Sequence, residues 1–182
     1  MNITEAQKEM RLRFAGGFYG QLVSSVVWLV SAATADRGST GAAMACLVFG
    51  GFLIFPMTEL LVRANKAAPL SKENTLRWLG MQVAFVLPFS MPLLLPITRY
   101  STGLFYPAMM ILLGAHYIPF VFLYGMRAFA VLAAFLIGGG FYLAVSGEHR
   151  FSTGAWYASV ILFVFAFVAR MVVKAERPDE SA

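Results

Sequence analysis

Six stretches of apolar residues, each long enough to cross a lipid bilayer, constrain this chain more than any other feature. A membrane-spanning helix needs about 20 predominantly apolar residues, and each stretch has roughly that length. The sequence therefore predicts an all-α fold, a polytopic transmembrane helical bundle with six spans. The predicted spans are Phe14–Thr34, Gly41–Val62, Trp78–Thr98, Leu104–Tyr124, Ala128–Ser146 and Thr153–Val173.

The composition also favours a membrane protein. Apolar residues make up 59% of the 182-residue chain and charged residues 13%, whereas soluble domains average roughly 45–50% and about 25%. A soluble protein of this size could not hide so much apolar surface, but lipid as the surrounding solvent removes that conflict. We expect a membrane domain over residues 14–173 and a cytosolic tail over residues 174–182. Residues 1–13 are expected to be cytosolic, as a short interfacial helix whose Met10, Leu12 and Phe14 lean into lipid.

The positive charges alternate between the two sides of the predicted membrane domain. Of the 14 Lys and Arg residues, eleven fall on the side of the two termini and three on the other. Positive residues beside membrane spans stay in the cytosol, so both termini are predicted to be cytosolic. The larger group is Lys8, Arg11, Arg13, Arg63, Lys66, Lys72, Arg77, Arg127, Arg170, Lys174 and Arg177, and the smaller group is Arg37, Arg99 and Arg150.

The first stretch has an alternative interpretation, because Ala33-Thr34-Ala35 looks like a signal-peptidase site. Its length and its polar residues Gln21, Ser24 and Ser25 favour a retained span instead. The short connections predict that consecutive helices are antiparallel neighbours, with one longer loop over residues 63–77. Gly125-Met126 is expected to turn the chain into the fifth span.

Aromatic residues near the ends of the stretches are expected to lie in the two membrane interfaces. Those at the cytosolic interface would be Trp78 and Tyr124, and those at the outer interface Tyr100, Tyr106, Trp156 and Tyr157.

Few polar groups lie within the spans, and each ionisable one is a candidate site because a charge in the bilayer is costly. Glu59 lies near the cytosolic end of the second span and Gln82 at a similar depth in the third. For Glu59, an i,i+4 ion pair with Arg63 and a buried carboxylate that binds a cation or proton are both open. His116, deep in the fourth span, is either a structural hydrogen-bonding group or part of a site. The candidate polar membrane site consists of Glu59, Gln82, His116, Tyr117 and Tyr124.

Prolines accompany these polar residues and are predicted to disrupt the helices. Pro56 and Pro119 each remove one helix hydrogen bond and free a carbonyl group. Pro88, Pro92 and Pro96 recur every four residues, so the outer half of the third span loses several backbone bonds. Broken helices often mark transporter binding sites, and a kinked helix packed on its neighbours is the alternative.

Several function classes find no support in the sequence. The positive charges are too scattered for a nucleic-acid partner, and Cys46 has no partner for a disulfide and no metal-ligand spacing. GxSxG, HExxH, Walker and GxGxxG motifs are absent. A haem held by two His residues would need a second deep His, and His149 falls in an outer loop. We therefore predict no metal, no cofactor and no enzymatic activity.

Short segments resemble a known group of proteins. Leu79-Gly80-Met81-Gln82, Gly114-Ala115-His116-Tyr117 and Phe122-Leu123-Tyr124-Gly125-Met126 resemble small multi-pass bacterial membrane proteins that form a domain family of unknown function. The resemblance covers most of the chain and implies a bacterial inner-membrane protein. It supplies no activity and no functional residues.

Two hypotheses about function follow. The first is a transporter or channel-like protein for a small solute, ion or proton, using a polar site on the inner half of the bundle. The second is a non-catalytic membrane subunit, assembly factor or stress factor that acts through contacts with a partner or with further copies of itself. One enclosed cavity shared by Glu59, Gln82 and His116 would favour the first hypothesis.

Overall fold

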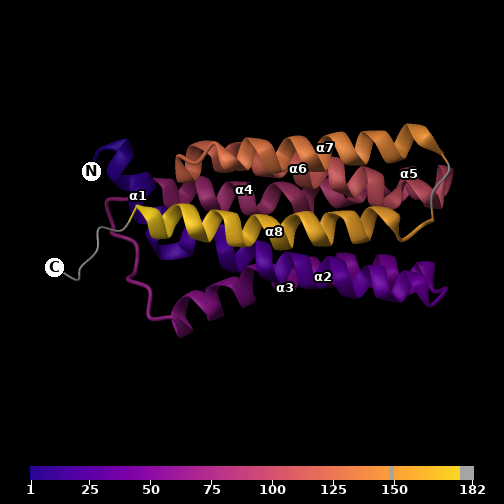
Figure 1. Ribbon diagram of the computed structural model, residues 1–182, viewed down its shortest axis with the longest axis horizontal. Coiled ribbons are helices and arrows are strands. Elements are labelled where there is room, and N and C mark those ends of the chain that lie inside the picture. Colours follow the sequence, from indigo (N-terminus) through magenta and orange to yellow (C-terminus); the bar gives the residue numbers. More distant parts are fainter. Residues whose placement is uncertain (148–149, 177–182) are drawn as a thin grey trace.

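The computed structural model describes residues 1–147 and 150–176, and all regular elements within these ranges are helices. Figure 1 shows the long helices side by side in one bundle, with α1 and the C-terminal end of α8 at the same end, which we call the α1 end. Most of the predicted tail, including Arg177, and the outer-loop His149 lie outside the described residues. The elements are α1 (Ile3–Phe14), η1 (Ala15–Gly17), α2 (Phe18–Asp36), α3 (Thr40–Ala64), α4 (Leu76–Ser90), η2 (Met91–Leu93), α5 (Leu94–Tyr100), η3 (Thr102–Leu104), α6 (Phe105–Tyr124), α7 (Ala128–Ser146) and α8 (Thr153–Ala175), where η marks a 3₁₀ turn.

Six helical segments of the described chain are long and apolar enough to cross a membrane. This confirms the all-α prediction and the number of apolar spans. The predicted ends agree to within two residues except at the start of the first span. The six segments are Ile3–Asp36, Thr40–Ala64, Leu76–Tyr100, Thr102–Tyr124, Ala128–Ser146 and Thr153–Ala175.

The first segment is interrupted where α1 meets α2. Ala15, Gly16 and Gly17 all have positive φ angles, of 48°, 65° and 86°, a conformation that glycine tolerates better than other residues. The helix direction changes there, so α2 begins four residues later than the predicted span. The expectation that Met10 leans into lipid was wrong, because its side chain is 3% exposed and packs in the protein core.

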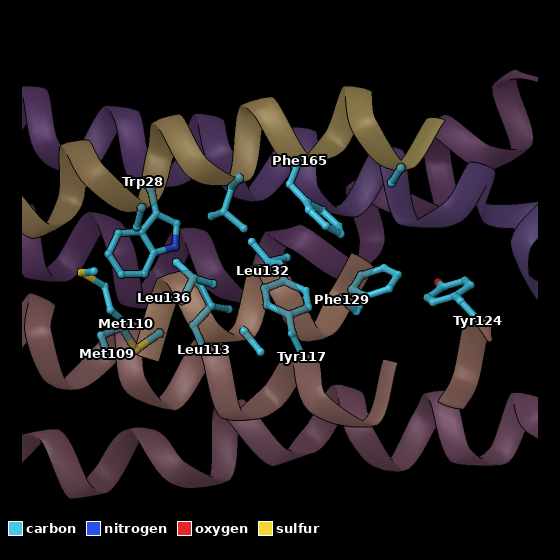
Figure 2. Packing of buried hydrophobic residues seen from close by; sticks show 14 of the residues in the cluster. Trp28, Met109, Met110, Leu113, Tyr117, Tyr124, Phe129, Leu132, Leu136 and Phe165 are labelled. Atoms are coloured by element: carbon cyan, nitrogen blue, oxygen red, sulfur yellow. The ribbon is translucent and has the colours of Figure 1, made fainter. Parts of the chain in front are cut away.

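The hydrophobic core lies among α2, α6, α7 and α8 (Figure 2). Trp28, Tyr106 and Phe129 are its largest fully buried side chains. Tyr106 and Tyr124, both expected in the membrane interfaces, are buried within the protein rather than exposed on its surface. The Tyr106 hydroxyl lies 2.7 Å from Ser31 Oγ, and the Tyr124 ring stacks on Phe129.

Consecutive membrane-spanning segments pack together along the chain with one exception, the second and the third, which contain α3 and α4. α3 packs mainly on α2, whereas α4 packs on α6. Figure 1 shows the last turns of α3 at the edge of the bundle. The expectation that all consecutive helices are neighbours was therefore wrong here. The connection over residues 65–75 is long enough for the chain to pass across the α1 end before α4 begins.

The prolines act differently in the different spans. α3 continues through Pro56 and α6 continues through Pro119, so neither residue breaks its helix. One missing hydrogen bond is tolerated when the neighbouring turns stay intact. The third span is interrupted, because the 3₁₀ turn η2 separates α4, which contains Pro88, from α5, which contains Pro96, and Pro92 lies in the turn itself.

Candidate binding cavity

A partly open cavity of about 390 Å³ lies at the α1 end of the bundle. α2 and α3 form one wall, α4 and α6 form the other, and α1 contributes to the end. The cavity therefore occupies the space left because α3 and α4 do not pack together. Its volume falls within the range of roughly 300–1,000 Å³ typical of small-molecule sites.

Four of the five predicted site residues line this cavity. Glu59 comes from α3, and His116, Tyr117 and Tyr124 come from α6. Gln82 does not take part: its side chain is exposed and it is not among the lining residues. The lining residues of α4 include Gly80, Ala84, Leu87 and Pro88, and at 100° per residue Gln82 falls on the opposite face of that helix.

Glu59 is part of a charge cluster. Its Oε2 atom lies 3.1 Å from Arg13 Nη2 and 3.7 Å from Arg63 Nε. The i,i+4 pair expected from the sequence is present, but the shorter contact comes from α1. The Arg13 and Glu59 side chains are 14% and 21% exposed, whereas Arg63 is 78% exposed. Arg13 also donates through Nη1 to the Ala68 carbonyl oxygen, at 3.0 Å, which ties α1 to the connection after α3.

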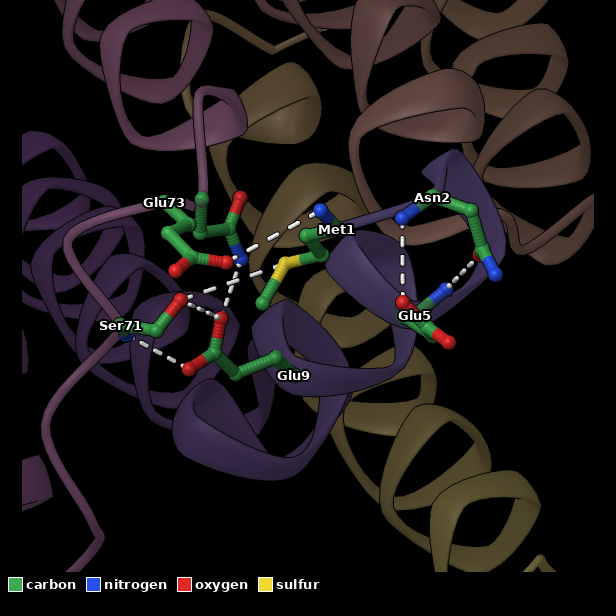
Figure 3. A network of polar contacts seen from close by, with 7 residues as sticks. Met1, Asn2, Glu5, Glu9, Ser71 and Glu73 are labelled. Carbon is green, nitrogen blue, oxygen red and sulfur yellow. Dashed lines mark hydrogen bonds and ion pairs between the residues drawn. The ribbon is translucent and has the colours of Figure 1, made fainter.

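α1 is held across this end of the cavity by polar contacts with the α3–α4 connection (Figure 3). The Glu9 carboxylate accepts hydrogen bonds from the Ser71 backbone N–H and from Asn74 Nδ2, both at 2.6 Å. Asn2 and Glu5 form a capping box that begins the helix. Three residues near the C-terminal end of α1 then line the cavity: Met10, Arg13 and Phe14.

α1 is also tied to two of the longer helices. Arg11 donates to the Tyr124 carbonyl oxygen at the end of α6, at 2.6 Å. Arg11 Nε lies 2.9 Å from Glu176 Oε2, just after α8. These contacts make α1 part of the folded bundle rather than a detached interfacial helix.

Four buried polar atoms on the cavity walls have no hydrogen-bond partner within the described chain: Gln21 Oε1, Ser24 Oγ, Arg77 Nε and His116 Nδ1. Gln21 and Ser24 are each only 2% exposed. The Tyr117 hydroxyl lies close to both, but no hydrogen bond of ordinary geometry reaches these two atoms. Buried polar groups in native proteins are normally bonded, so four such atoms around one cavity point to a polar occupant, either water or a ligand.

Polarity changes along the length of the cavity. Arg13, Glu59, Arg77 and Gln21 lie near the α1 end, and Ser24 and His116 lie about two helical turns from the ends of α2 and α6 that are near α1. The deepest lining residues are apolar and include Trp28, Leu47, Met91, Met109 and Leu113. The site can therefore hold a charged group at the α1 end and apolar atoms towards the middle of the bundle.

The described residues contain no group of three or more His, Cys, Asp or Glu side chains that could hold a metal ion. The cavity walls instead offer guanidinium, hydroxyl, amide and imidazole groups, which suit recognition by hydrogen bonds and charge.

Comparison with known proteins identifies the family of the chain but no more specific relationship. The family described as "Family of unknown function (DUF7010)" matches residues 3–172. The chain belongs to this family. No curated protein and no solved structure matches the chain. The expected resemblance to a family of unknown function is thus confirmed, and for this DUF7010 member the cavity provides the evidence about function.

The sequence left several cavity residues of this DUF7010 protein unrecognised as site residues. Gln21 and Ser24 are spaced three apart and so share a helix face, a signal that could have placed them together. Arg13 and Arg77 were counted as charges that set the orientation. Their part in the site depends on the positions of α1 and α4, which are separated by more than 60 residues.

Proposed function

We propose that this protein is a bacterial inner-membrane transport protein that binds a small solute in the cavity between α2–α3 and α4–α6. The observation that carries the proposal is the meeting of Glu59, His116, Tyr117 and Tyr124 in one cavity, whose lining residues also contain four buried polar atoms without a hydrogen-bond partner among the described residues. A cavity with a few convergent polar groups is the usual form of a small-molecule site. Buried polar groups at membrane depth commonly mark solute pathways.

The proposed orientation has both termini and the α1 end in the cytosol. Arg63, Arg77 and Arg170 belong to the ends of α3, α4 and α8 near α1, together with most of the other positive residues. The opposite ends of the helices carry Arg37, Arg99 and Arg150. By the positive-inside rule, the cavity then opens in the cytosolic half of the membrane.

Transport fits the charge arrangement better than catalysis. Glu59 is the one acid among the described residues that line the cavity, and two arginines neutralise it. A general base must be free to take a proton from the substrate, whereas the Glu59 carboxylate is held by ion pairs with Arg13 and Arg63. The same ion pairing makes Glu59 a poor cation site by itself, so an anionic or zwitterionic solute is favoured.

A single-cysteine experiment tests whether the cavity is open to water. Cys46 is replaced by Ala, and then either Ser24 or Ser159 is replaced by Cys. Ser24 and Ser159 are both buried, at 2% and 6% exposed, but only Ser24 lines the cavity. We expect a charged, membrane-impermeant methanethiosulfonate reagent to modify Ser24→Cys at least tenfold faster than Ser159→Cys, and faster from the cytosolic side. Equal protection of both thiols would mean a dry, packed bundle and would overturn the proposal.

One observation supports the alternative function, in which the protein acts through contacts with a partner protein. In the apolar part of the spans that contain α3 and α4, 11% of the residues are buried inside the protein. The corresponding share is 33–44% in the spans that contain α6, α7 and α8. A partner helix could therefore cover α3 and α4. The mass of the purified protein in detergent separates the two functions, because a strict monomer with no co-purifying protein would remove the contact function.

A further inference from the structure

We propose that the solute is a single-chain amphiphile with an anionic headgroup, and that it enters the cavity sideways from the lipid between α3 and α4. This inference rests on the proposed function and names the ligand of the same cavity. It rests on three features: a positive group without an ion-pair partner among the described residues, apolar walls that lead away from that group, and a gap between two helices that faces the bilayer.

The positive group is the Arg77 guanidinium. The charge of Arg13 is matched by Glu59 at 3.1 Å, whereas Arg77 Nε is buried without a hydrogen-bond partner among the described residues. The Arg77 guanidinium lies 5.0 Å from the centre of the Trp78 ring, which holds it beside the cavity. An arginine presents several N–H donors in a fork that matches a carboxylate or phosphate group. The charged end of the cavity therefore prefers an anion.

Neutral polar groups lie next to the charged end of the cavity, on the side towards the middle of the bundle. Gln21 Oε1 and Ser24 Oγ have no hydrogen-bond partner among the described residues, whereas the His116 imidazole interacts with the backbone of Val83. A headgroup with donor and acceptor atoms, or waters around it, would satisfy the Gln21 and Ser24 atoms. This second observation is independent of the charge, because Gln21 and Ser24 are almost completely buried.

The apolar part of the cavity suits a single hydrocarbon chain. Beyond the polar layer the walls consist of side chains such as Trp28, Leu47, Met109 and Leu113, and apolar atoms transferred there from water gain roughly 25 cal/mol per Å². The volume of about 390 Å³ is near the lower end of the small-molecule range. The polarity gradient gives the ligand one orientation, with its head at the α1 end and its chain towards the middle of the bilayer.

The gap between α3 and α4 provides the entrance. The two helices do not pack on each other, although both line the cavity. The turn η2, which follows α4, approaches α3 where the Met91 methyl group would lie 3.3 Å from a Cβ atom on Gly51, so a flexible side chain closes the far end of the gap. A lipid-soluble ligand reaches the cavity through this gap without leaving the bilayer.

The experiment measures binding of parinaric acid, a fluorescent fatty acid, to the full-length protein in nanodiscs of neutral phosphatidylcholine. The methyl ester of the probe lacks the charge, and butyrate lacks the chain. We expect the acid to bind at least tenfold more tightly than its ester, because only the ionised acid accepts charge-assisted hydrogen bonds from the Arg77 guanidinium. We expect butyrate not to displace it. Displacement by lysophosphatidylglycerol would extend the ligand class to phosphate headgroups, and failure to displace would restrict it to carboxylates.

Two matched pairs of variants locate the binding. Arg77→Gln is expected to weaken binding at least tenfold, whereas Arg127→Gln, an exposed arginine outside the cavity, is expected to change it less than twofold. Ala84→Phe places a ring in the cavity and is expected to abolish binding. Val86→Phe, on the exposed face of the same helix, is expected to leave binding unchanged.

The outcomes separate this inference from the proposed function. Equal affinity for acid and ester, full displacement by butyrate, or no binding at all would overturn the amphiphilic anion. If Ser24→Cys is still modified in that case, a hydrated transport cavity remains and only the ligand class is wrong. If Ser24→Cys is protected, the proposed function fails as well.

Discussion

Two glycines of α6 and α7, Gly114 and Gly140, bring helix backbones together, whereas the glycines of α3 and α4 face side chains or open space. A Cβ atom on Gly140 would lie 2.7 Å from the Pro107 carbonyl oxygen, and one on Gly114 would lie 3.0 Å from the Ala133 carbonyl oxygen. On the cavity side, the nearest atom to a Cβ on Gly80 is the Met10 methyl group, at 3.7 Å. Small residues thus bring the backbones of α6 and α7 together, and no glycine of α3 or α4 meets the backbone of the other helix.

The difference has a physical cause in the membrane. Lipid tails are as apolar as leucine, so helices in a bilayer associate through close van der Waals packing and hydrogen bonds rather than through the hydrophobic effect. α6 and α7 obtain part of that packing at Gly114 and Gly140. α3 and α4 lack it with each other, and their separation is what allows a cavity with polar walls.

The largest expected effect is on the closely packed side. Gly140→Ala should lower the free energy of unfolding by about 1–3 kcal/mol, because overpacking a filled interface forces the structure apart and a backbone carbonyl cannot rotate out of the way. Gly138→Ala is the control on the same helix, since nothing lies within 4 Å of a Cβ there. Reversible unfolding of both variants in mixed micelles checks this, and equal loss in the two would contradict close packing of α7 on α6.

A smaller loss of stability is expected from a substitution where α2, α3 and α6 meet. Ser31 Oγ donates to the Ala43 carbonyl oxygen at 2.7 Å and lies 2.7 Å from the Tyr106 hydroxyl, so one polar group joins three helices. Tyr106→Phe should cost about 0.6 kcal/mol, the average for such bonds between membrane helices. Tyr100→Phe, at a side chain that is 88% exposed, should cost nothing measurable. A Tyr106→Phe variant as stable as Tyr100→Phe would show that α3 is held at this junction without the hydroxyl.

The sequence was sufficient for features that depend on distance along a single helix. The ends of the spans follow from the length of apolar chain that a bilayer requires. The turn at Gly125 was expected from glycine, and the structure places that residue after α6 with a φ angle of 62°. Depth could be predicted in the same way, which is why Glu59 and His116 were found as candidates.

Features that depend on the rotation of a helix or on its partner could not be predicted. Gln82 was expected at the depth of Glu59, but it faces away from the cavity. The hydrophobic pattern does not settle rotation in a span that is apolar all round. The Arg13–Glu59 ion pair joins residues 46 positions apart, and no local rule selects Arg13 over Arg63. The separation of α3 from α4 has the same origin, because a long connection leaves the choice of neighbour open.

The smallest expected change in the free energy of unfolding is at Gly80, on the cavity side, where the substitution is expected to stabilise the protein rather than destabilise it. Gly80→Ala adds a methyl group where the nearest atoms, at 3.7 to 3.9 Å, are the ends of the Met10 and Leu123 side chains. Alanine is the better helix former by roughly 0.5–1 kcal/mol, so the free energy of unfolding should stay constant or rise by about 0.5 kcal/mol. Gly114→Ala, measured beside it, should lose stability because Ala133 blocks the added methyl group with backbone. A loss for Gly80→Ala as large as that for Gly114→Ala would mean that α4 is packed as tightly as α6 and α7, and the cavity would then have no open wall.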